Sequence, residues 1–267
     1  MSIFHKTIKV LFIFFLLVAI FSFFKKGKLP SSGQIQNKIK QEPIQEKTEK
    51  KEFVIKYLDK DYKIIPLAEY ELWGIVATHN DIRKWYNFYH DKNSVNIKDF
   101  CVIWGKLAES GFYNLFNFRS GEWTCYVDFN RNVFRGEDAA KNLKAYEEWR
   151  KYSAQGYSNN HLLGDTEEIR QEINKTRIGD QIYFKGMLVK YGKSDLPEKH
   201  FRESSMIRED SDCEVVYVTE YKILKRATPF YYLLYNISRI ILIILLVLEV
   251  LLIFLEAFQY TKKQKNI

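Results

Sequence analysis

Two apolar segments, one at each end of the chain, constrain this protein more than any other feature of its sequence. Residues 10–24 form an uncharged run between lysines, and a longer apolar segment begins at Phe230 and ends before a basic tail. At about 1.5 Å per residue, the first segment is short for a ~30 Å hydrocarbon core, whereas the second is long enough to cross it. The sequence therefore predicts a membrane protein with spans at 8–24 and 230–259 and a tail at 260–267.

The first apolar segment fits two interpretations. Its length suits the apolar region of a signal peptide, and it also suits a short anchor whose flanking lysines reach the membrane interface. A signal peptidase site requires small residues, but this segment ends in bulky Phe21, Phe23 and Phe24. We therefore favour an uncleaved anchor.

The second apolar segment contains acidic residues. Glu249 interrupts the apolar run, and Glu256 follows seven positions later on nearly the same helix face. An acid within a membrane is a candidate for a proton-linked role or for binding another helix. The simpler interpretation is a protonated side chain, or one turned toward the first helix.

Two spanning helices place both termini on one side of the membrane and the domain on the other. Lysines on the domain side outnumber those in the tails, which taken alone favours a cytoplasmic domain. Charge bias is weak for a loop of this length, however, and that orientation would require translocation of a charged amino terminus. We therefore expect a two-pass inner-membrane protein with cytoplasmic termini and an external domain. Its expected partners are membrane lipid and either another envelope protein or a second copy that associates through the spanning helices.

The middle of the chain divides by composition. Residues 25–53 combine mixed charge with prolines and serines and have almost no aromatics, which predicts a polar flexible linker. Residues 54–228 hold most of the aromatic residues and predict one globular domain. The net charge of +8 comes largely from lysines beside the apolar segments or in the linker, so membrane lipid explains it more simply than nucleic acid.

Local patterns predict the elements of this domain. Runs rich in β-branched and aromatic residues predict five strands, at 70–78, 100–104, 123–129, 181–191 and 213–224. Helical spacing predicts helices at 137–152 and 165–177, the second beginning with a capping-box-like pair, Asp165 and Glu168.

The order of these elements predicts the fold. Three strands, a helix and two strands is the order of an OB-like barrel, and Gly186 in the fourth strand suits the sharp bend that closure of a small barrel requires. We therefore predict a membrane-anchored β-rich α+β domain built on an OB-like five-stranded barrel. An unrelated β-sandwich or another α+β arrangement is the alternative.

Four motifs follow one another in this domain: SNNHLL, GDQIYFKGMLV, SSMIRED and CEVVYV, with DFCVIWG as a weaker upstream match. In this order they resemble a family of bacterial membrane-anchored envelope proteins, in which a His-Leu stretch precedes a Gly-Asp strand, a Ser-Ser-x-x-Arg-x-Asp segment and a Cys-Glu strand. The sequence departs from that pattern at Ser211 and Asp212, where the family has a Gly-rich approach to the Cys-Glu pair. The resemblance covers most of the domain and implies a relationship of fold, with no activity attached.

The polar motifs supply the candidate site residues. A hydrolase would need a base, a nucleophile and an orienting acid, for which the candidates are His161, Ser204 or Ser205, and Asp210 or Glu214. The chain has no G-x-S-x-G motif, so the hydrolase is the alternative interpretation. The preferred interpretation is that His161 and Arg208 stabilise irregular loops. A third is a ligand or peptide surface formed by Asn159, Asn160, His161 and Arg208.

The cysteines and histidines predict no metal site. Cys101, Cys125 and Cys213 lack CxxC spacing and are too few for a four-cysteine zinc site. Cys101 and Cys125 lie on predicted neighbouring strands, so they are candidates for a disulfide if the domain is external, and Cys213 could compete for either partner. The simpler interpretation is that all three are free, buried thiols. The histidines have no H-E-x-x-H or comparable spacing, and we predict neither metal nor cofactor.

The sequence therefore favours a non-enzymatic envelope protein whose domain binds another protein, a peptide or an envelope component. The alternative is a membrane-anchored hydrolase that uses His161 with Ser204 or Ser205. Nucleic acid is a common ligand of OB barrels, but membrane tethering and the expected external location argue against it.

Overall fold

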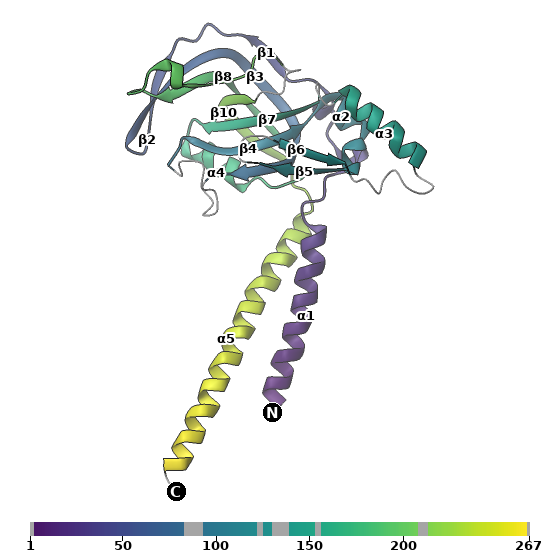
Figure 1. The fold of residues 1–267 in the computed structure, drawn as a ribbon, viewed down its shortest axis with the longest axis vertical. Helices are drawn as coiled ribbons and strands as arrows, with labels where there is room; N and C mark the ends of the chain where they lie inside the picture. Colours follow the sequence, from purple (N-terminus) through teal and green to yellow (C-terminus); the bar gives the residue numbers. More distant parts are fainter. Residues whose placement is uncertain are drawn as a thin grey trace. The chain divides into compact units, whose positions relative to one another are not determined.

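The computed structural model describes residues 3–82, 93–121, 125–129, 139–152, 156–207 and 213–265. The chain divides into two compact units. One contains the terminal helices, residues 1–28 and 228–267, and the other is the β-rich domain, residues 29–227. The fold is mixed α+β and rich in sheet, with one apolar helix at each end of the chain (Figure 1).

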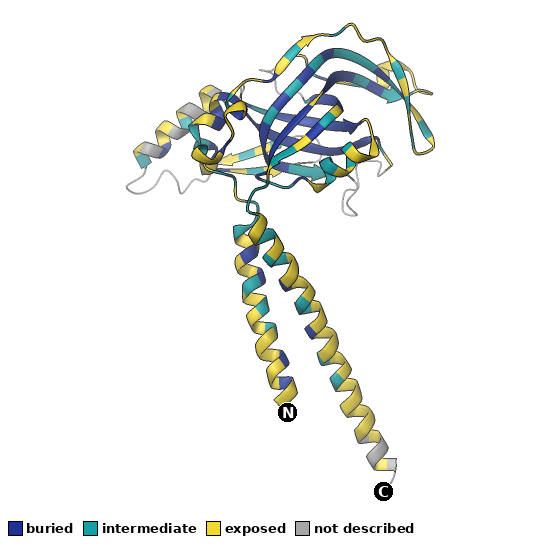
Figure 2. Cartoon of the chain, turned by 180° about the vertical axis from the view of Figure 1, so that it is seen from behind, coloured by how far each residue is buried: buried dark blue, intermediate teal, exposed yellow. Residues whose placement is uncertain are grey.

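The first unit consists of α1 (Ile3–Lys25) and α5 (Pro229–Lys265), which pack side by side (Figure 1). By length and composition, 23 residues of α1 and 31 of α5 are sufficient to cross a membrane. Most of their apolar side chains are exposed (Figure 2), as expected of surfaces that contact lipid. α1 begins before the predicted residue 8, and α5 continues into the predicted tail, because the polar residues that flank both apolar runs are compatible with helix.

The domain is organised around five paired strands: β3 (Lys60–Asp81), β4 (Asn96–Ile103), β7 (Tyr157–Gly164), β8 (Gln181–Lys193) and β10 (Glu214–Lys225). β3 pairs with β4, β4 with β7, β7 with β10, β10 with β8, and β8 again with β3. Of these five pairings, β7 with β10 is parallel and the others are antiparallel. Side chains of these strands form the largest buried apolar cluster, which includes Tyr70, Leu72, Phe100, Val102, Leu162, Phe184, Val216 and Val218.

Shorter elements surround these strands. β1 (Ile44–Lys47) and β2 (Phe53–Tyr57) pair with β3, β9 (Arg202–Glu203) pairs with β8, and β5 (Phe116–Ser120) and β6 (Cys125–Phe129) form a separate two-stranded sheet. The helices of the domain are α2 (Gly105–Ser110), α3 (Ala139–Tyr152) and α4 (Glu167–Lys175). Short 3₁₀ turns lie at Ser32–Gln34, Asn37–Lys40, Phe112–Leu115 and Glu198–His200.

The third strand of the five differs from the sequence prediction. The predicted strand at 123–129 is present as β6 from Cys125, but it pairs with β5 and not with β4. The strand that pairs with β4 is β7, which contains the SNNHLL motif. Its side chains do not show the apolar alternation of a typical strand, because polar residues occupy buried positions in it. Some of their polar atoms bond to other elements, whereas Oδ1 of Asn160 has no hydrogen-bond partner among the described residues.

The predicted linker also differs. Within 25–53, Ile35 and Ile39 are buried, and β1 pairs with β3. The backbone of Gln36 donates a 2.9 Å hydrogen bond to Oε1 of Gln181, whose Nε2 donates to the carbonyl of Gln34 at 3.0 Å. Two isoleucines four positions apart, together with these backbone bonds, are sufficient to order a segment whose average composition is that of a linker.

The helix after β7 begins one residue later than its sequence pattern suggests. Thr166 is the N-cap of α4, and its Oγ1 accepts from the backbone of Ile169 at 3.4 Å. Asp165 is occupied elsewhere, because its Oδ1 accepts a 2.6 Å hydrogen bond from the hydroxyl of Tyr217. Either residue type is a good N-cap, so only the tertiary contact distinguishes the two positions.

Candidate functional site

A buried polar cluster forms where β4, β7 and β9 meet. The register of β4 and β7 places Asp99 opposite His161, and the two side chains pair through Oδ1 and Nδ1. Arg202, on β9, contacts Nε2 of the same imidazole. Asp99 is 2% exposed and His161 is fully buried. The fold thus brings an acid, an imidazole and a guanidinium into one line beneath the surface.

The partners of His161 determine its tautomer. A guanidinium can only donate hydrogen bonds, so Nε2 accepts from Arg202 and the ring proton is on Nδ1, which donates to Asp99. Nδ2 of Asn96 donates a 3.0 Å hydrogen bond to the same oxygen of Asp99. Both ring nitrogens of His161 are therefore engaged, and neither remains to accept a proton from a serine.

The candidate serines stabilise the segment between β9 and β10. The hydroxyl of Ser204 accepts from the backbone of Val215 at 3.0 Å and donates to the carbonyl of Ser205 at 2.9 Å. The hydroxyl of Ser205 donates to the carbonyl of Ile207 at 3.1 Å and accepts from its backbone N–H at 3.0 Å. The bonds of Ser205 are those of a local turn, whereas the bond to Val215 ties Ser204 to the start of β10. Arg208 and Asp210 lie outside the described residues.

Other candidates of the polar motifs are buried as well. Nδ2 of Asn159 donates to Sγ of Cys213 at 3.1 Å, and Nδ2 of Asn160 donates to the hydroxyl of Ser158 at 2.9 Å. Glu214 is 7% exposed and lies opposite Asn160 in the parallel pairing. Burial raises the pKa of the Cys213 thiol, so the protonated form prevails at neutral pH and the sulfur is a poor nucleophile.

Cys101 and Cys125 are joined by a disulfide, with their Cα atoms 5.9 Å apart. The bond connects β4 to β6, and thus the larger sheet to the two-stranded sheet, rather than two neighbouring strands of one barrel. Cys213 takes part in no disulfide within the described residues. Within the described residues, no three His, Cys, Asp or Glu side chains are grouped so as to bind a metal ion.

The outer face of β4 and β7 is not open to solvent. Every residue of β4 is buried, and so is every residue of β7 after Tyr157 (Figure 2). Apolar side chains from β2, from the end of β8 and from the segments around α2 cover this face. A ligand cannot reach these two strands without displacing part of the domain.

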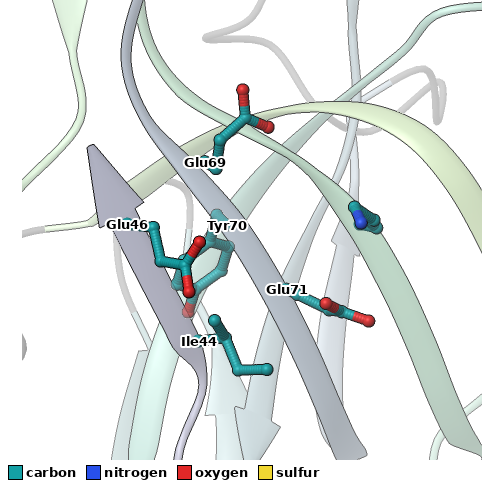
Figure 3. A pocket seen from close by; sticks show the side chains of 6 residues that line it. Ile44, Glu46, Glu69, Tyr70 and Glu71 are labelled. Atoms are coloured by element: carbon teal, nitrogen blue, oxygen red, sulfur yellow. The ribbon is translucent and has the colours of Figure 1, made fainter. Parts of the chain in front are cut away.

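An open hollow of about 240 Å³ lies on β1, β3 and β8. Glu46, Glu69 and Glu71 contribute carboxylates to it from two neighbouring strands (Figure 3). Lys185 is the one cation among the residues that line it. The hydroxyl of Tyr183 donates a 2.8 Å hydrogen bond to Glu71 and orients it. Sequence reasoning missed this hollow, because its residues form no motif and one of its walls comes from the supposed linker.

Comparison of the chain with family models, curated proteins and solved structures finds no match. The geometry of the chain itself is thus the basis for any functional conclusion.

Glu249 lies in the helical unit. Its Oε1 is 2.9 Å from Nδ1 of His5, and Oε1 of Glu256 is 3.0 Å from Nε2 of the same ring. The structure thus places both acids of α5 against a histidine of α1, where the sequence offered an acid facing the other helix as one of several interpretations. His5 was not among the sequence candidates, because it precedes the apolar run and only the packing of the helices places it beside Glu249.

Proposed function

We propose that this protein is a non-enzymatic membrane-anchored binding protein, whose domain binds an extended, basic segment of another protein at the hollow on β1, β3 and β8. The observation that carries the proposal is the charge of this hollow, which is lined by three carboxylates and the cation of Lys185. Lys50 pairs with Glu69 at 3.3 Å, so the carboxylates still exceed the nearby cations by one. Complementary charge at an exposed surface favours encounter with a partner of opposite sign.

The position of β1 supports an extended partner. β1 is at one end of the strand order, and within the described residues its outer edge pairs with no strand. A peptide can add to such an edge through backbone hydrogen bonds, while its alternate side chains reach the neighbouring surface. Ile44 is 44% exposed on β1 beside the carboxylates, so the hollow suits alternating apolar and basic side chains.

The buried polar cluster argues against the hydrolase alternative. A general base must reach the nucleophile that it activates, but both nitrogens of buried His161 are paired with Asp99 and Arg202. Ser204 and Ser205 are engaged in a local turn. No observation favours catalysis by these residues.

The fold proposed for the domain is an OB-like five-stranded barrel. Its support is the order of pairing, which leads from β3 through β4, β7, β10 and β8 back to β3, with α4 between the third and fourth strands. OB folds commonly bind nucleic acids on their second and third strands, here β4 and β7, and that face is covered. The fold thus supports a protein partner over nucleic acid.

The location proposed is a bacterial inner membrane, with cytoplasmic termini and the domain outside. The disulfide between Cys101 and Cys125 supports it, since such bonds persist in oxidising compartments. Single cysteines at Ser32 and Lys265 test the orientation in intact cells with a membrane-impermeant maleimide, after Cys213→Ser removes the cysteine that is outside the disulfide. Labelling at Ser32 alone is expected, whereas labelling at Lys265 alone would reverse the orientation.

The binding test uses the full chain in detergent and two labelled peptides, one of alternating lysine and valine and one of alternating glutamate and valine. Fluorescence anisotropy is expected to show binding of the lysine peptide, weakened about tenfold by Glu46→Lys with Glu69→Lys. Each of Glu46→Lys and Glu69→Lys is also made singly, and Glu109→Lys on α2, a single charge reversal away from the hollow, is the control matched to these single variants. Equal binding of both peptides, or equal loss in the control, would refute the site.

A further inference from the structure

Two cations converge on one aromatic ring in the helical unit. Nζ of Lys26, directly after α1, is 3.4 Å from the centre of the Tyr235 ring, and Cζ of Arg239 is 5.4 Å from the same centre. Lys26 also lies 4.8 Å from the centre of the Phe23 ring. Each contact is a favourable cation–π interaction, but the two like charges repel each other.

In the part of the chain that the structure describes, no acid pairs with either of these two cations. None of the ion pairs among the described residues includes Lys26 or Arg239. Burial lowers the pKa of Lys26, and the neighbouring charge of Arg239 lowers it further. The cluster therefore has the electrostatic character of an anion site.

The cluster borders an apolar hollow. A space of about 400 Å³ is lined by Ala19, Ile20, Phe23, Phe24, Tyr235 and Arg239. Arg239 directly precedes the apolar run that starts at Ile240, and Lys26 closely follows the run that ends at Phe24. The two cations thus lie at the same end of the two apolar runs, where a bilayer changes from hydrocarbon to headgroups.

We propose that Lys26, Tyr235 and Arg239 form a binding site for the phosphate of an anionic phospholipid, with an acyl chain of that lipid in the adjoining hollow. A guanidinium binds phosphate oxygens in a bidentate manner, and an ammonium adds a point charge. Basic pockets between spanning helices bind anionic lipid headgroups in other membrane proteins, on the cytoplasmic or matrix side. In the orientation proposed above, the present site faces the outer leaflet. This lipid site requires that α1 and α5 span a membrane, as proposed above. It does not require the proposed peptide-binding hollow on the domain.

The net charge of the site determines which lipid it prefers. Phosphatidylglycerol carries one uncompensated negative charge, which two cations can attract. Phosphatidylcholine carries a quaternary ammonium of its own, which the same cations repel. Each cation near a membrane surface strengthens attraction to anionic lipid about fivefold, so the pair should contribute roughly 25-fold.

The test is native mass spectrometry of the full chain in detergent with equal concentrations of phosphatidylglycerol and phosphatidylcholine. The wild type is expected to retain phosphatidylglycerol preferentially, and Lys26→Gln with Arg239→Gln to reduce that preference by roughly 25-fold. Lys6→Gln with Lys9→Gln removes the same charge at the other end of α1 and should retain the preference. Equal loss in this control, or no loss in the Lys26 and Arg239 variant, would overturn the proposal.

Two further measurements distinguish a lipid from a soluble phosphate and from misfolding. Ile20→Trp fills the hollow without altering charge and is expected to weaken phosphatidylglycerol retention, while glycerol 1-phosphate at equal concentration should not displace the lipid. Displacement by glycerol 1-phosphate would assign the site to a soluble phosphate. Lysine-peptide binding should be unchanged in every variant, so failure of the lipid site and failure of the peptide site give separate results.

Discussion

Nδ1 of His5 lies 2.9 Å from Oε1 of Glu249, and the contact joins the first helix of the chain to the last across 244 sequence positions. Glu249 interrupts an apolar run, where an unpaired carboxylate would cost about 2.5–3.5 kcal/mol at a bilayer centre. A hydrogen bond to a neighbouring helix offsets part of this cost. The pair therefore selects one packing of α1 against α5.

Glu249→Leu is expected to weaken the association of α1 with α5, because it removes the Nδ1 partner of His5. Interhelical hydrogen bonds in membranes contribute about 0.6 kcal/mol on average, which corresponds to roughly a threefold change in association. Ile8 and Leu245 line one groove between the helices, so the yield of a disulfide between Ile8→Cys and Leu245→Cys, in a Cys213→Ser background, measures the effect. Glu249→Gln can still form the hydrogen bond and is the control that should retain the yield.

His161→Leu is expected to lower the free energy of unfolding of the domain by about 3–5 kcal/mol, because it leaves buried Asp99 and the guanidinium of Arg202 without their shared partner. Urea unfolding of the full chain in detergent, followed by tryptophan fluorescence, measures the change. Exposed His200→Leu should change the same quantity by less than about 0.5 kcal/mol. A loss below about 1 kcal/mol for His161→Leu would show that the cluster is not important for stability.

Gly186→Ala is expected to destabilise the domain by about 1–3 kcal/mol or more. A Cβ at this position would lie 2.0 Å from the backbone oxygen of Tyr217, so strands β8 and β10 would have to move apart. Gly33→Ala, whose Cβ would meet no atom within 4 Å, is the matched substitution. Thermal unfolding should give a lower midpoint temperature for Gly186→Ala than for Gly33→Ala. Equal midpoint temperatures would show that β8 and β10 can accommodate the added methyl group.

The stability of the domain should fall as pH rises from about 10 toward 12. Burial raises the pKa of Tyr113 to about 12 and that of Tyr191 to about 12, whereas tyrosine in an unfolded chain titrates near 10. Between pH ~10 and the folded pKa of about 12, these tyrosines are deprotonated in the unfolded chain and still protonated in the folded domain, so rising pH favours unfolding. The stabilisation is fully present below pH ~10 and is lost as the pH approaches the folded pKa. Urea unfolding at a series of pH values measures the fall.

Tyr113→Phe should make that alkaline fall shallower. It also removes a 2.6 Å hydrogen bond from the Tyr113 hydroxyl to the carbonyl of Pro30, which is worth about 0.5–1.5 kcal/mol at pH 8. Exposed Tyr126→Phe should alter stability at pH 8 by less than about 0.5 kcal/mol. An unchanged alkaline slope in Tyr113→Phe would assign the fall to other groups.

Hydrophobic periodicity in the sequence predicted a strand or a helix correctly where that element buries a regular apolar face. The predicted strands at 70–78, 100–104, 181–191 and 213–224 lie within or overlap β3, β4, β8 and β10, and the helix after β7 is present with a cap shifted by one residue. Each of these segments shows its periodicity without reference to the rest of the chain. Residues 44–47 became part of the sheet only because β3 provides an edge for them.

The candidate site could not be predicted in the same way. SNNHLL supplied polar candidates for a site, but it is a buried strand, in which His161 pairs with another strand and Asn160 bonds to Ser158 of its own strand. His161 and its partner Asp99 are 62 positions apart, and no spacing in the sequence links them. The same holds for the hollow on β1, β3 and β8, whose carboxylates converge through strand register alone.

The sequence by itself determined that this chain has two apolar terminal helices and a β-rich domain between them, because hydrophobic length and periodicity are local properties. The tertiary structure decided which strands pair, that the polar motif lies inside, and that Lys26 and Arg239 share the ring of Tyr235. A buried polar group is stable only when its partner is in place, and that partner can be anywhere in the chain. Only the folded chain brings such groups together.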